Sequence, residues 1–255
     1  MDTLLNVSHV SYSYHTLSGE TPALSDISFS VKEGEFLSIV GPSGCGKSTL
    51  LSLLASLMEP ESGTITLRQE PLSAHTTNVG YMLQKDHLFE WRTVYRNIIL
   101  GLEIQKKMTP RYLSHVDQLM EIYGLSAFKN ARPSELSGGM RQRAALIRTL
   151  ALDPDLLLLD EPFSALDYQT RLNVCDDVRQ IIRQERKTAI LVTHDLSEAI
   201  SMSDRVLILG KRPATILQDL PIRFQDPELS PMDRRQAPEF KGYFNTIWKE
   251  LNRHE

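Results

Sequence analysis

The sequence predicts an α/β protein with a mostly parallel core sheet, and three observations lead to this class. A phosphate-loop pattern at residues 41–49 stands between an apolar run and a leucine-rich segment, the strand–loop–helix context that the pattern requires. Apolar runs at residues 156–159 and 189–193 are typical of parallel strands buried on both faces. Alternation of apolar and polar residues at 27–31 indicates a half-buried strand in an N-terminal antiparallel layer.

The expected elements follow in chain order from the same periodicities. Residues 5–14 resemble 27–31, so both are assigned to the antiparallel layer. Between 89 and 152, apolar residues recur at helical spacing, which predicts helices there. After Lys211 the chain is proline-rich, and it is then expected to form a last amphipathic helix that carries Phe240 and Ile247. The remaining expected elements are strands at 36–40, 63–67, 79–84 and 206–209 and helices at 50–58 and 140–152.

These elements divide one domain into three parts. Residues 1–88 and 153–215 are predicted to form the α/β core with its antiparallel layer. Residues 89–152 are predicted to be an inserted helical subdomain, and 216–255 a C-terminal tail that ends in the amphipathic helix.

Composition narrows the class of protein. The chain has 255 residues, of which 41% are hydrophobic and 24% charged, the values of an ordinary globular protein. A formal charge of −4 makes nucleic acid a poor default partner, so none is expected. No apolar run is long enough to cross a bilayer, and the first residues do not resemble a signal peptide, which predicts a cytosolic location. Cys45 and Cys175 are expected to be free thiols.

The phosphate loop is the strongest functional signal. Its glycines let backbone N–H groups turn towards phosphate oxygens, and the following helix adds a positive dipole end. Lys47 is expected to reach the β- and γ-phosphates, and Ser48 to ligate Mg²⁺. A purely structural Gly-rich turn is the alternative, which the full pattern in its context makes improbable. The predicted nucleotide-binding residues here are Gly41, Pro42, Ser43, Gly44, Cys45, Gly46, Lys47, Ser48 and Thr49.

Further candidate residues stand at the ends of expected strands, where ligands of α/β sheets collect. Asp160 suits the magnesium shell, and the adjacent Glu161 is then available to deprotonate the attacking water. His194 is placed to contact the γ-phosphate or water, and Gln84 to touch Mg²⁺ or the water through its amide. The alternatives are a pair of solvated acids before Pro162 and a structural histidine.

A second loop-then-helix segment, Ser137-Gly138-Gly139, resembles half of a phosphate site. Ser137 is a plausible helix N-cap, and the glycines leave the backbone accessible. Because no lysine accompanies this loop, we expect another copy of the protein to complete its site. A helix cap without any ligand is the alternative.

These motifs, in this order, resemble the nucleotide-binding subunits of the ATP-binding-cassette (ABC) family over roughly residues 5–215. The resemblance implies a P-loop NTPase fold with a RecA-like core and ATP hydrolysis with ATP and Mg²⁺ bound. It also implies a head-to-tail dimer, either a homodimer or a pair with another ATPase subunit, in which Ser137, Gly138 and Gly139 act in trans and Asp167 lies at the dimer seam. Tyr14 takes the place of the aromatic residue that stacks on adenine, with Tyr12 a near competitor.

The segment 83–94 is similar to that of importers for nitrate, sulfonates and taurine, although Glu90 stands where their typical form has Pro, and its part 84–94 is the region expected to contact membrane subunits. In related importers this surface receives the membrane permease, so Phe89, Trp91 and Arg92 become candidate contacts. Simple packing of the aromatic residues is the alternative. The resemblance thus implies a peripheral subunit on the cytoplasmic face of the membrane, served indirectly by an external solute-binding protein and without a sugar-importer regulatory domain.

Three functions remain open at the level of sequence. The leading hypothesis is the ATPase subunit of an importer, for which nitrate, sulfonates, taurine and thiamine-pathway pyrimidines are all possible solutes. The second is a soluble ATP-driven clamp in DNA repair or translation, although the long insertion or second cassette of those relatives is absent. The third is an ATP-sensing interaction module.

Overall fold

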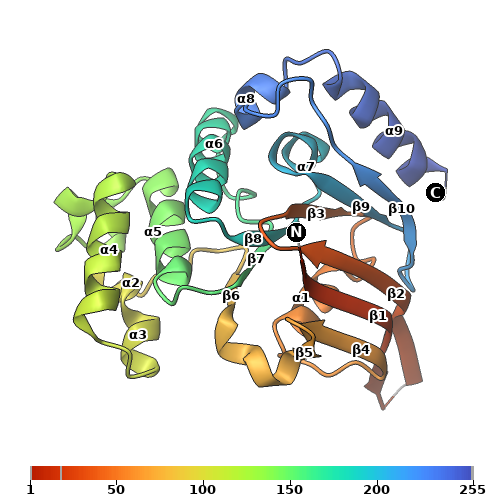
Figure 1. Cartoon of the computed structure of the whole chain (residues 1–255), viewed down its shortest axis with the longest axis horizontal. Coiled ribbons are helices and arrows are strands. Elements are labelled where there is room, and N and C mark those ends of the chain that lie inside the picture. Colours follow the sequence, from red (N-terminus) through yellow and green to blue (C-terminus); the bar gives the residue numbers. More distant parts are fainter. Residues whose placement is uncertain (1, 18, 254–255) are drawn as a thin grey trace.

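Two sheets form the frame of the protein in a computed structural model that describes residues 2–17 and 19–253. The four-stranded sheet is antiparallel, and the six-stranded sheet is parallel except for β10 at its edge (Figure 1). In spatial order the four strands are β2 (Gly19–Lys32), β1 (Thr3–Thr16), β4 (Ser62–Leu67) and β5 (Glu70–Pro71). The six are β10 (Ile216–Pro221), β9 (Arg205–Leu209), β3 (Phe36–Val40), β8 (Thr188–Val192), β7 (Leu156–Asp160) and β6 (Val79–Met82).

The helices cover the parallel sheet and extend away from it at one side (Figure 1). A group of helices between β6 and β7 makes up the left side of that view, and the last helices return over the sheet near β9 and β10. The α-helices are α1 (Lys47–Leu54), α2 (Val94–Ile98), α3 (Leu100–Ile104), α4 (Pro110–Ile122), α5 (Gly138–Leu150), α6 (Tyr168–Gln184), α7 (Leu196–Met202), α8 (Pro231–Arg234) and α9 (Phe240–Asn252); the short 3₁₀ helices are η1 (Leu72–Asn78), η2 (Ser126–Phe128) and η3 (Pro133–Glu135).

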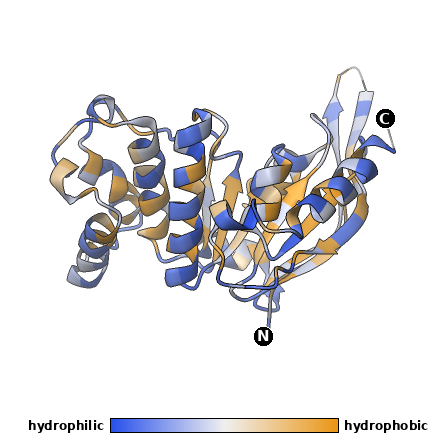
Figure 2. Cartoon of the chain, turned by 90° about the horizontal axis from the view of Figure 1, so that it is seen from above, coloured by the Kyte–Doolittle hydropathy of each residue, from blue (hydrophilic) through white to orange (hydrophobic). Residues whose placement is uncertain are grey.

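Continuous apolar sequence explains the burial of the central strands. β3 pairs in parallel with β8 through Leu37 and Ile190 and with β9 through Leu37 and Arg205. The strands β3 and β8 are buried at every position, as expected of a parallel sheet covered on both faces. Figure 2 shows the hydrophobic residues gathered along these strands inside the molecule.

Helix α1 lies in the core between the two sheets. Its four leucines are all at most 1% exposed, and they pack with residues of β1, β2, β3 and β8 in one hydrophobic cluster. Burial of this size is worth roughly 1.5–3 kcal/mol per leucine. The phosphate loop at the start of α1 is therefore held between β3 and a helix fixed by the core.

A second cluster joins α4 and α5 to the parallel sheet. It runs from Val116 and Met120 through Ala144 and Ile147 to Leu157, all nearly or fully buried. The helical spacing of apolar residues expected between 89 and 152 thus corresponds to the buried faces of α4 and α5. The subdomain boundaries at 88/89 and 152/153 stay a prediction.

Two differences from the expected elements have physical causes. The first helix begins at Lys47, inside the phosphate loop, and ends at Leu54 rather than at residue 58, because Ser56 adopts a left-handed φ of 54°. Residues 216–221, expected in the tail, form strand β10 at the sheet edge. Its polar, half-exposed positions do not alternate cleanly, so periodicity does not reveal it.

The C-terminal helix and the cysteines agree with expectation. α9 is amphipathic and packs on α7 with Ile247 fully buried. Cys45 and Cys175 are both free and buried. Within the described residues, no helix has the length and apolar character needed to traverse a bilayer.

Candidate functional site

A cleft of about 620 Å³ lies around the phosphate loop. The loop after β3 forms its floor, and residues from the ends of β7 and β8 line one side. Part of β1 and the loop between β9 and β10 line another. The lining residues are Tyr14, Ala23, Ser43, Gly44, Gly46, Lys47, Ser48, Thr49, Glu161, His194 and Arg212.

The phosphate loop has the backbone shape of an anion site. Gly44 and Gly46 have φ values of 72° and 124°, and a Cβ on Gly46 would stand 2.9 Å from the carbonyl oxygen of Ala23. No described side chain caps the N-terminus of α1, which leaves its first N–H groups for a ligand. Lys47 Nζ donates to the carbonyl oxygens of Gly41 and Pro42 at 2.8 and 2.9 Å, which holds the cation over the loop.

Three residues of the pattern shape the loop without lining the cleft. Gly41, Pro42 and Cys45 are absent from the cleft wall that the described residues form. The Cys45 side chain is 2% exposed and packs in the core, where burial raises the pKa of its thiol. Its N–H donates to the Pro42 carbonyl oxygen at 3.3 Å. The predicted contact of Cys45 with nucleotide is therefore limited to its backbone.

The two tyrosines of β1 differ in position. Tyr14 lines the cleft, is 38% exposed, and its hydroxyl lies 3.0 Å from Thr49 Oγ1. The Arg212 guanidinium stands 5.8 Å from the Tyr14 ring centroid. Tyr12 packs instead against the core, edge-on to Tyr14. Of the two candidates, Tyr14 alone faces the cleft.

The adjacent carboxylates Asp160 and Glu161 have different neighbours. Asp160 accepts from the Tyr81 hydroxyl at 3.2 Å and from Ser48 Oγ at 3.5 Å. Burial raises the pKa of the Asp160 carboxyl. Glu161 follows β7 in a left-handed conformation with φ 43°. Its carboxylate contacts Gln84 and His194, not the Tyr81 and Ser48 hydroxyls that Asp160 accepts from. The geometry agrees with separate tasks for the two acids.

Glu161 Oε2 contacts two other residues that the sequence predicts for the site, Gln84 and His194. Gln84 Nε2 donates to it at 3.3 Å, and His194 Nδ1 lies 3.2 Å away. Gln84 also donates to Ser164 Oγ at 3.3 Å. Gln84 therefore sits beside the proposed water-activating carboxylate, and its amide has no hydrogen bond to Ser48 or Asp160 among the contacts of the described residues.

The oxygen donors at the loop fit a magnesium ion bound together with phosphate. The Ser48 hydroxyl and the half-buried Asp160 carboxylate are hard ligands on adjacent elements. Within residues 2–17 and 19–253, no group of three or more His, Cys, Asp and Glu side chains gathers to hold a metal. Such a site thus relies on phosphate oxygens and water for its remaining ligands, as Mg²⁺ sites commonly do.

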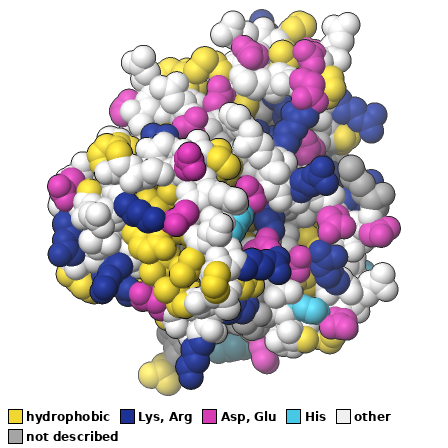
Figure 3. All heavy atoms as spheres, turned by 60° about the vertical axis from the view of Figure 1, so that its left-hand side comes forward, with side chains coloured by type: hydrophobic (Ala, Val, Ile, Leu, Met, Phe, Trp, Pro, Cys, Tyr) yellow, Lys and Arg dark blue, Asp and Glu magenta, His cyan; other side chains and the backbone are white. Residues whose placement is uncertain are grey.

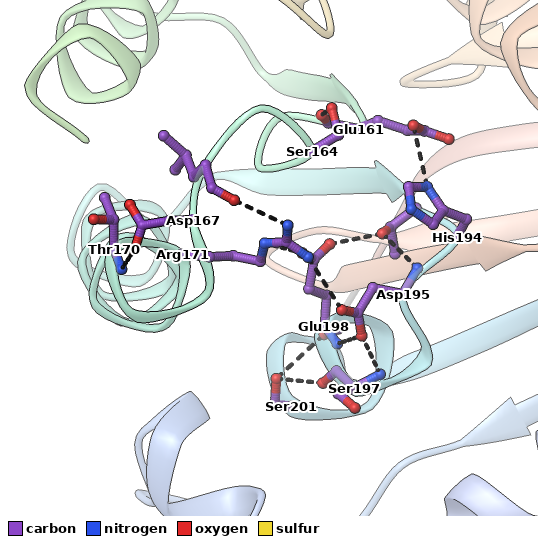
Figure 4. A network of polar contacts seen from close by, with 12 residues as sticks. Glu161, Ser164, Asp167, Thr170, Arg171, His194, Asp195, Ser197, Glu198 and Ser201 are labelled. Carbon is purple, nitrogen blue, oxygen red and sulfur yellow. Dashed lines mark hydrogen bonds and ion pairs between the residues drawn. The ribbon is translucent and has the colours of Figure 1, made fainter. Parts of the chain in front are cut away.

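A buried polar network, missed by sequence reasoning, positions His194 (Figure 4). Thr193 donates to Glu198 at 2.6 Å, and Glu198 is 3% exposed with its pKa raised by burial. Asp195 caps α7 by accepting from the N–H groups of Ser197 and Glu198. Arg171 donates to the Leu166 carbonyl oxygen at 3.0 Å and to Asp195 at 3.5 Å. The loop before α6 is thereby tied to the His194 loop.

Ser137 is the N-cap of α5, as predicted, and accepts from the Met140 N–H at 3.3 Å. A Cβ on Gly138 would stand 3.1 Å from Leu166, and one on Gly139 3.1 Å from Val174, so both glycines permit close packing of α5 on the α6 segment. Asp167 caps α6 by accepting from the Thr170 N–H. Neither this loop nor Asp167 belongs to the cleft wall formed by the described residues.

The comparisons with known proteins agree with this geometry. Residues 24–164 match the family model described as "ABC transporter". The uncharacterized ABC transporter ATP-binding protein YtlC of Bacillus subtilis is 46% identical over 250 residues, which cover 98% of this chain and 96% of YtlC. The taurine import ATP-binding protein TauB of Ruegeria pomeroyi is 37% identical over 243 residues, which cover 95% of this chain and 90% of TauB.

A solved structure places the fold in the same family. The dimeric post-hydrolysis structure of the ATP-binding cassette MJ0796 bound to ADP and Pi has a TM-score of 0.73 at 27% identity, covering 86% of this chain and 99% of that one. The P-loop NTPase fold expected from the sequence is confirmed. The family model spans more than half of the chain, and YtlC and TauB match at least 95% of it. The chain therefore belongs to the ABC transporter family, as an ATP-binding subunit.

Proposed function

We propose that this chain hydrolyses ATP on the cytoplasmic face of a membrane as the peripheral ATPase subunit of an importer. The observation that carries the proposal is an exposed aromatic pair, Phe89 and Trp91, within a segment similar to that of importers for nitrate, sulfonates and taurine. Relatives named taurine import ATP-binding proteins support it at 37–40% identity. No observation favours a clamp in DNA repair or translation, or an ATP sensor.

The proposed chemistry is attack of water on the γ-phosphate of ATP, which yields ADP and phosphate. Glu161 takes the proton of the attacking water, while His194 and Gln84, both in contact with Glu161, orient that water. Lys47 stabilises charge on the phosphates. Mg²⁺ held by Ser48 and Asp160 would add further neutralisation of phosphate charge.

The proposed adenine contact is the ring of Tyr14. The ring faces the cleft beside Arg212, and its hydroxyl is anchored on Thr49, at the base of the phosphate loop. Stacking on an aromatic face needs no specific hydrogen bond to the base. Arg212 is a further candidate contact on the same wall.

The proposed assembly is a head-to-tail pair in which Ser137, Gly138 and Gly139 of one subunit cover the nucleotide of the other. Two features support it. The capped loop lies outside the cleft of its own chain, and α5 presents N–H groups without a lysine. Structural neighbours at 27% identity are described as dimeric. Asp167, on the adjoining α6, would then lie at the seam.

The proposed permease contact is a rigid aromatic surface formed by Phe89 and Trp91. Their ring centroids are 4.7 Å apart, and Trp91 is 73% exposed. The buried Asn97 side chain accepts from the Phe89 N–H and donates to the carbonyl oxygens of Phe89 and Thr93, which fixes the backbone below. Figure 3 shows hydrophobic side chains gathered among charged ones on the side of the molecule that lies at the left of Figure 1.

Glu90, the departure from the importer pattern, connects this surface to α5. Arg141 forms ion pairs with Glu90 and with Asp86, each at 2.9 Å. Arg141 follows Gly139 by two residues on α5. Movement of the permease against Trp91 can therefore reach the loop that we place over the partner's nucleotide. Coupling of this kind is a shift between two packed states.

We expect Trp91→Ala to leave ATP hydrolysis by the isolated subunit unchanged and to lower solute uptake by the assembled transporter at least about tenfold. The reason is that tryptophan is enriched among the few interface residues whose truncation costs about 2 kcal/mol or more of binding free energy. Uptake and ATPase activity of the reconstituted transporter would be measured together. Trp248→Ala, on α9 and 55% exposed, is the matched control. Uptake unaffected by Trp91→Ala would contradict this contact.

The solute does not touch this subunit, so uptake must be measured with its permease and solute-binding protein. Taurine, other sulfonates, nitrate and thiamine-pathway pyrimidines form the panel, and we expect one class to be accumulated in an ATP-dependent manner. Full ATPase activity without any membrane partner, together with failure of the chain to co-purify with one, would overturn the importer proposal.

A further inference from the structure

A second cleft, of about 880 Å³, shares no lining residue with the nucleotide cleft. It lies where the end of α6 meets α8 and the chain that follows β10; α6 and α8 are neighbours in Figure 1. The site chemistry described above uses none of its residues. The lining residues are Glu33, Gly34, Arg179, Ile182, Arg183, Arg186, Lys187, Asp204, Ile222, Arg223, Phe224, Gln225, Pro227, Glu228 and Arg234.

This cleft is strongly basic in a chain with a net charge of −4. Six of its lining residues are Lys or Arg, and three are Asp or Glu. Arg179 pairs with Asp204 at 2.7 Å, and Arg183 pairs with Glu228. The side chains of Arg186 and Arg223 form no ion pair with any described residue, and both residues are exposed. The wall therefore carries cations that its own acids do not neutralise.

Arg234 adds a buried donor to this wall. The residue is only 7% exposed, and its Nε has no hydrogen-bond partner among the described residues. Its Nη atoms make long contacts of 3.3–3.4 Å to the carbonyl oxygens of Ser201, Ser203 and Pro227. A buried, incompletely paired guanidinium is costly unless an anion completes its bonding.

Another part of the cleft wall is apolar and can contact the carbon skeleton of a ligand. Phe224 stacks on the Arg234 guanidinium, with its ring centroid 5.1 Å away, and Ile222 is buried beside it. Ile182 and Pro227 complete the apolar lining. Apolar walls with a few placed charges are the usual composition of a small-molecule site.

We propose that this cleft binds a small organic anion, whose carboxylate, sulfonate or phosphate group is held by Arg234, Arg223 and Arg186 and whose carbon skeleton rests on Phe224 and Ile222. The size of the cleft and its apolar wall favour an organic anion over a bare inorganic one. The site is separate from the nucleotide cleft, so it does not depend on the proposed function.

Isothermal titration calorimetry on the full chain tests the site, with citrate and inorganic phosphate as probes. The protein is first saturated with a non-hydrolysable ATP analogue, whose γ-phosphate fills the position that inorganic phosphate could take beside ADP, and ionic strength is held constant. We expect saturable citrate binding and weaker phosphate binding. The double substitution Arg186→Ala with Arg223→Ala should weaken citrate binding at least about tenfold, since hydrogen bonds between charged groups are roughly twice as strong as neutral ones. Both side chains are exposed, so the fold should tolerate their loss.

The control variant is Lys106→Ala, which removes an exposed cation outside the cleft and should leave citrate binding unchanged. Absence of saturable citrate binding would overturn the proposal, and so would equal binding by the double variant. If Lys106→Ala weakened citrate binding as much as the double variant does, the loss of affinity would be explained by net charge alone, and the proposed site would also be overturned. Tighter binding of phosphate than of citrate would refute the organic ligand.

Discussion

Replacement of Glu161 by Gln is expected to lower the turnover of ATP by about 10²–10⁴-fold, the usual contribution of a general base. The carboxylate lies 3.2 Å from His194 and 3.3 Å from Gln84, so the amide keeps the shape of the site but cannot accept the proton of the water. ATP binding should persist, because the phosphate loop and Tyr14 are untouched. Single-turnover hydrolysis and equilibrium binding of ATP would be measured side by side.

The matched control for this substitution is Glu121→Gln, on the exposed surface of α4. It changes net charge in the same way and should retain normal turnover. Near-normal turnover by Glu161→Gln would contradict the assignment of Glu161 as the general base that deprotonates the attacking water. Loss of ATP binding would place Glu161 in nucleotide binding instead.

Replacement of Ser137 by Tyr is expected to abolish hydrolysis while sparing the binding of ATP to the single subunit. The bulky ring would block the loop that we place over the partner's nucleotide. The substitution also removes the N-cap hydrogen bond to Met140, at a cost of about 1 kcal/mol, too little to unfold most proteins. ATP affinity, ATP-dependent dimerisation and hydrolysis would be measured on the same preparation.

Ser230→Tyr is the matched control, because Ser230 is likewise an N-cap, of α8, and accepts from the Asp233 N–H. It should lose the same capping energy and keep hydrolysis. Loss of ATP binding in the Ser137→Tyr monomer would contradict a role in trans. Equal loss of hydrolysis in both variants would assign the effect to capping alone.

The sequence predicts those parts of the fold and site that depend on local pattern. The apolar runs of β3, β7 and β8 mark parallel strands, and the glycine and lysine spacing marks the phosphate loop. The capping role of Ser137 is also local, since its partner is the Met140 N–H three residues away. For such features, spacing along the chain determines spacing in the structure.

Features that depend on distant pairing could not be predicted. Arg212 reaches the nucleotide cleft because β10 folds back on β9, and the half-polar sequence of β10 gives no clear strand period. The contact of Arg171 on α6 with Asp195, the N-cap of α7, joins residues 24 positions apart. Tyr14 and Tyr12 are two residues apart on β1, so the strand period does not separate them, and only their distance from the phosphate loop in the folded chain leaves Tyr14 in the cleft.

The central claim is that the loop at Ser137 acts on the nucleotide of a second subunit. Disulfide cross-linking tests it most directly, with Ser137→Cys in one preparation and Ser43→Cys in another, both carrying Glu161→Gln to retain ATP. Ser43 lines the nucleotide cleft, and the natural cysteines are buried. With ATP and mild oxidation, the mixture of the two variants is predicted to form a covalent dimer that neither variant forms alone. No covalent dimer in the mixture, or equal amounts in the unmixed samples, would contradict the head-to-tail arrangement.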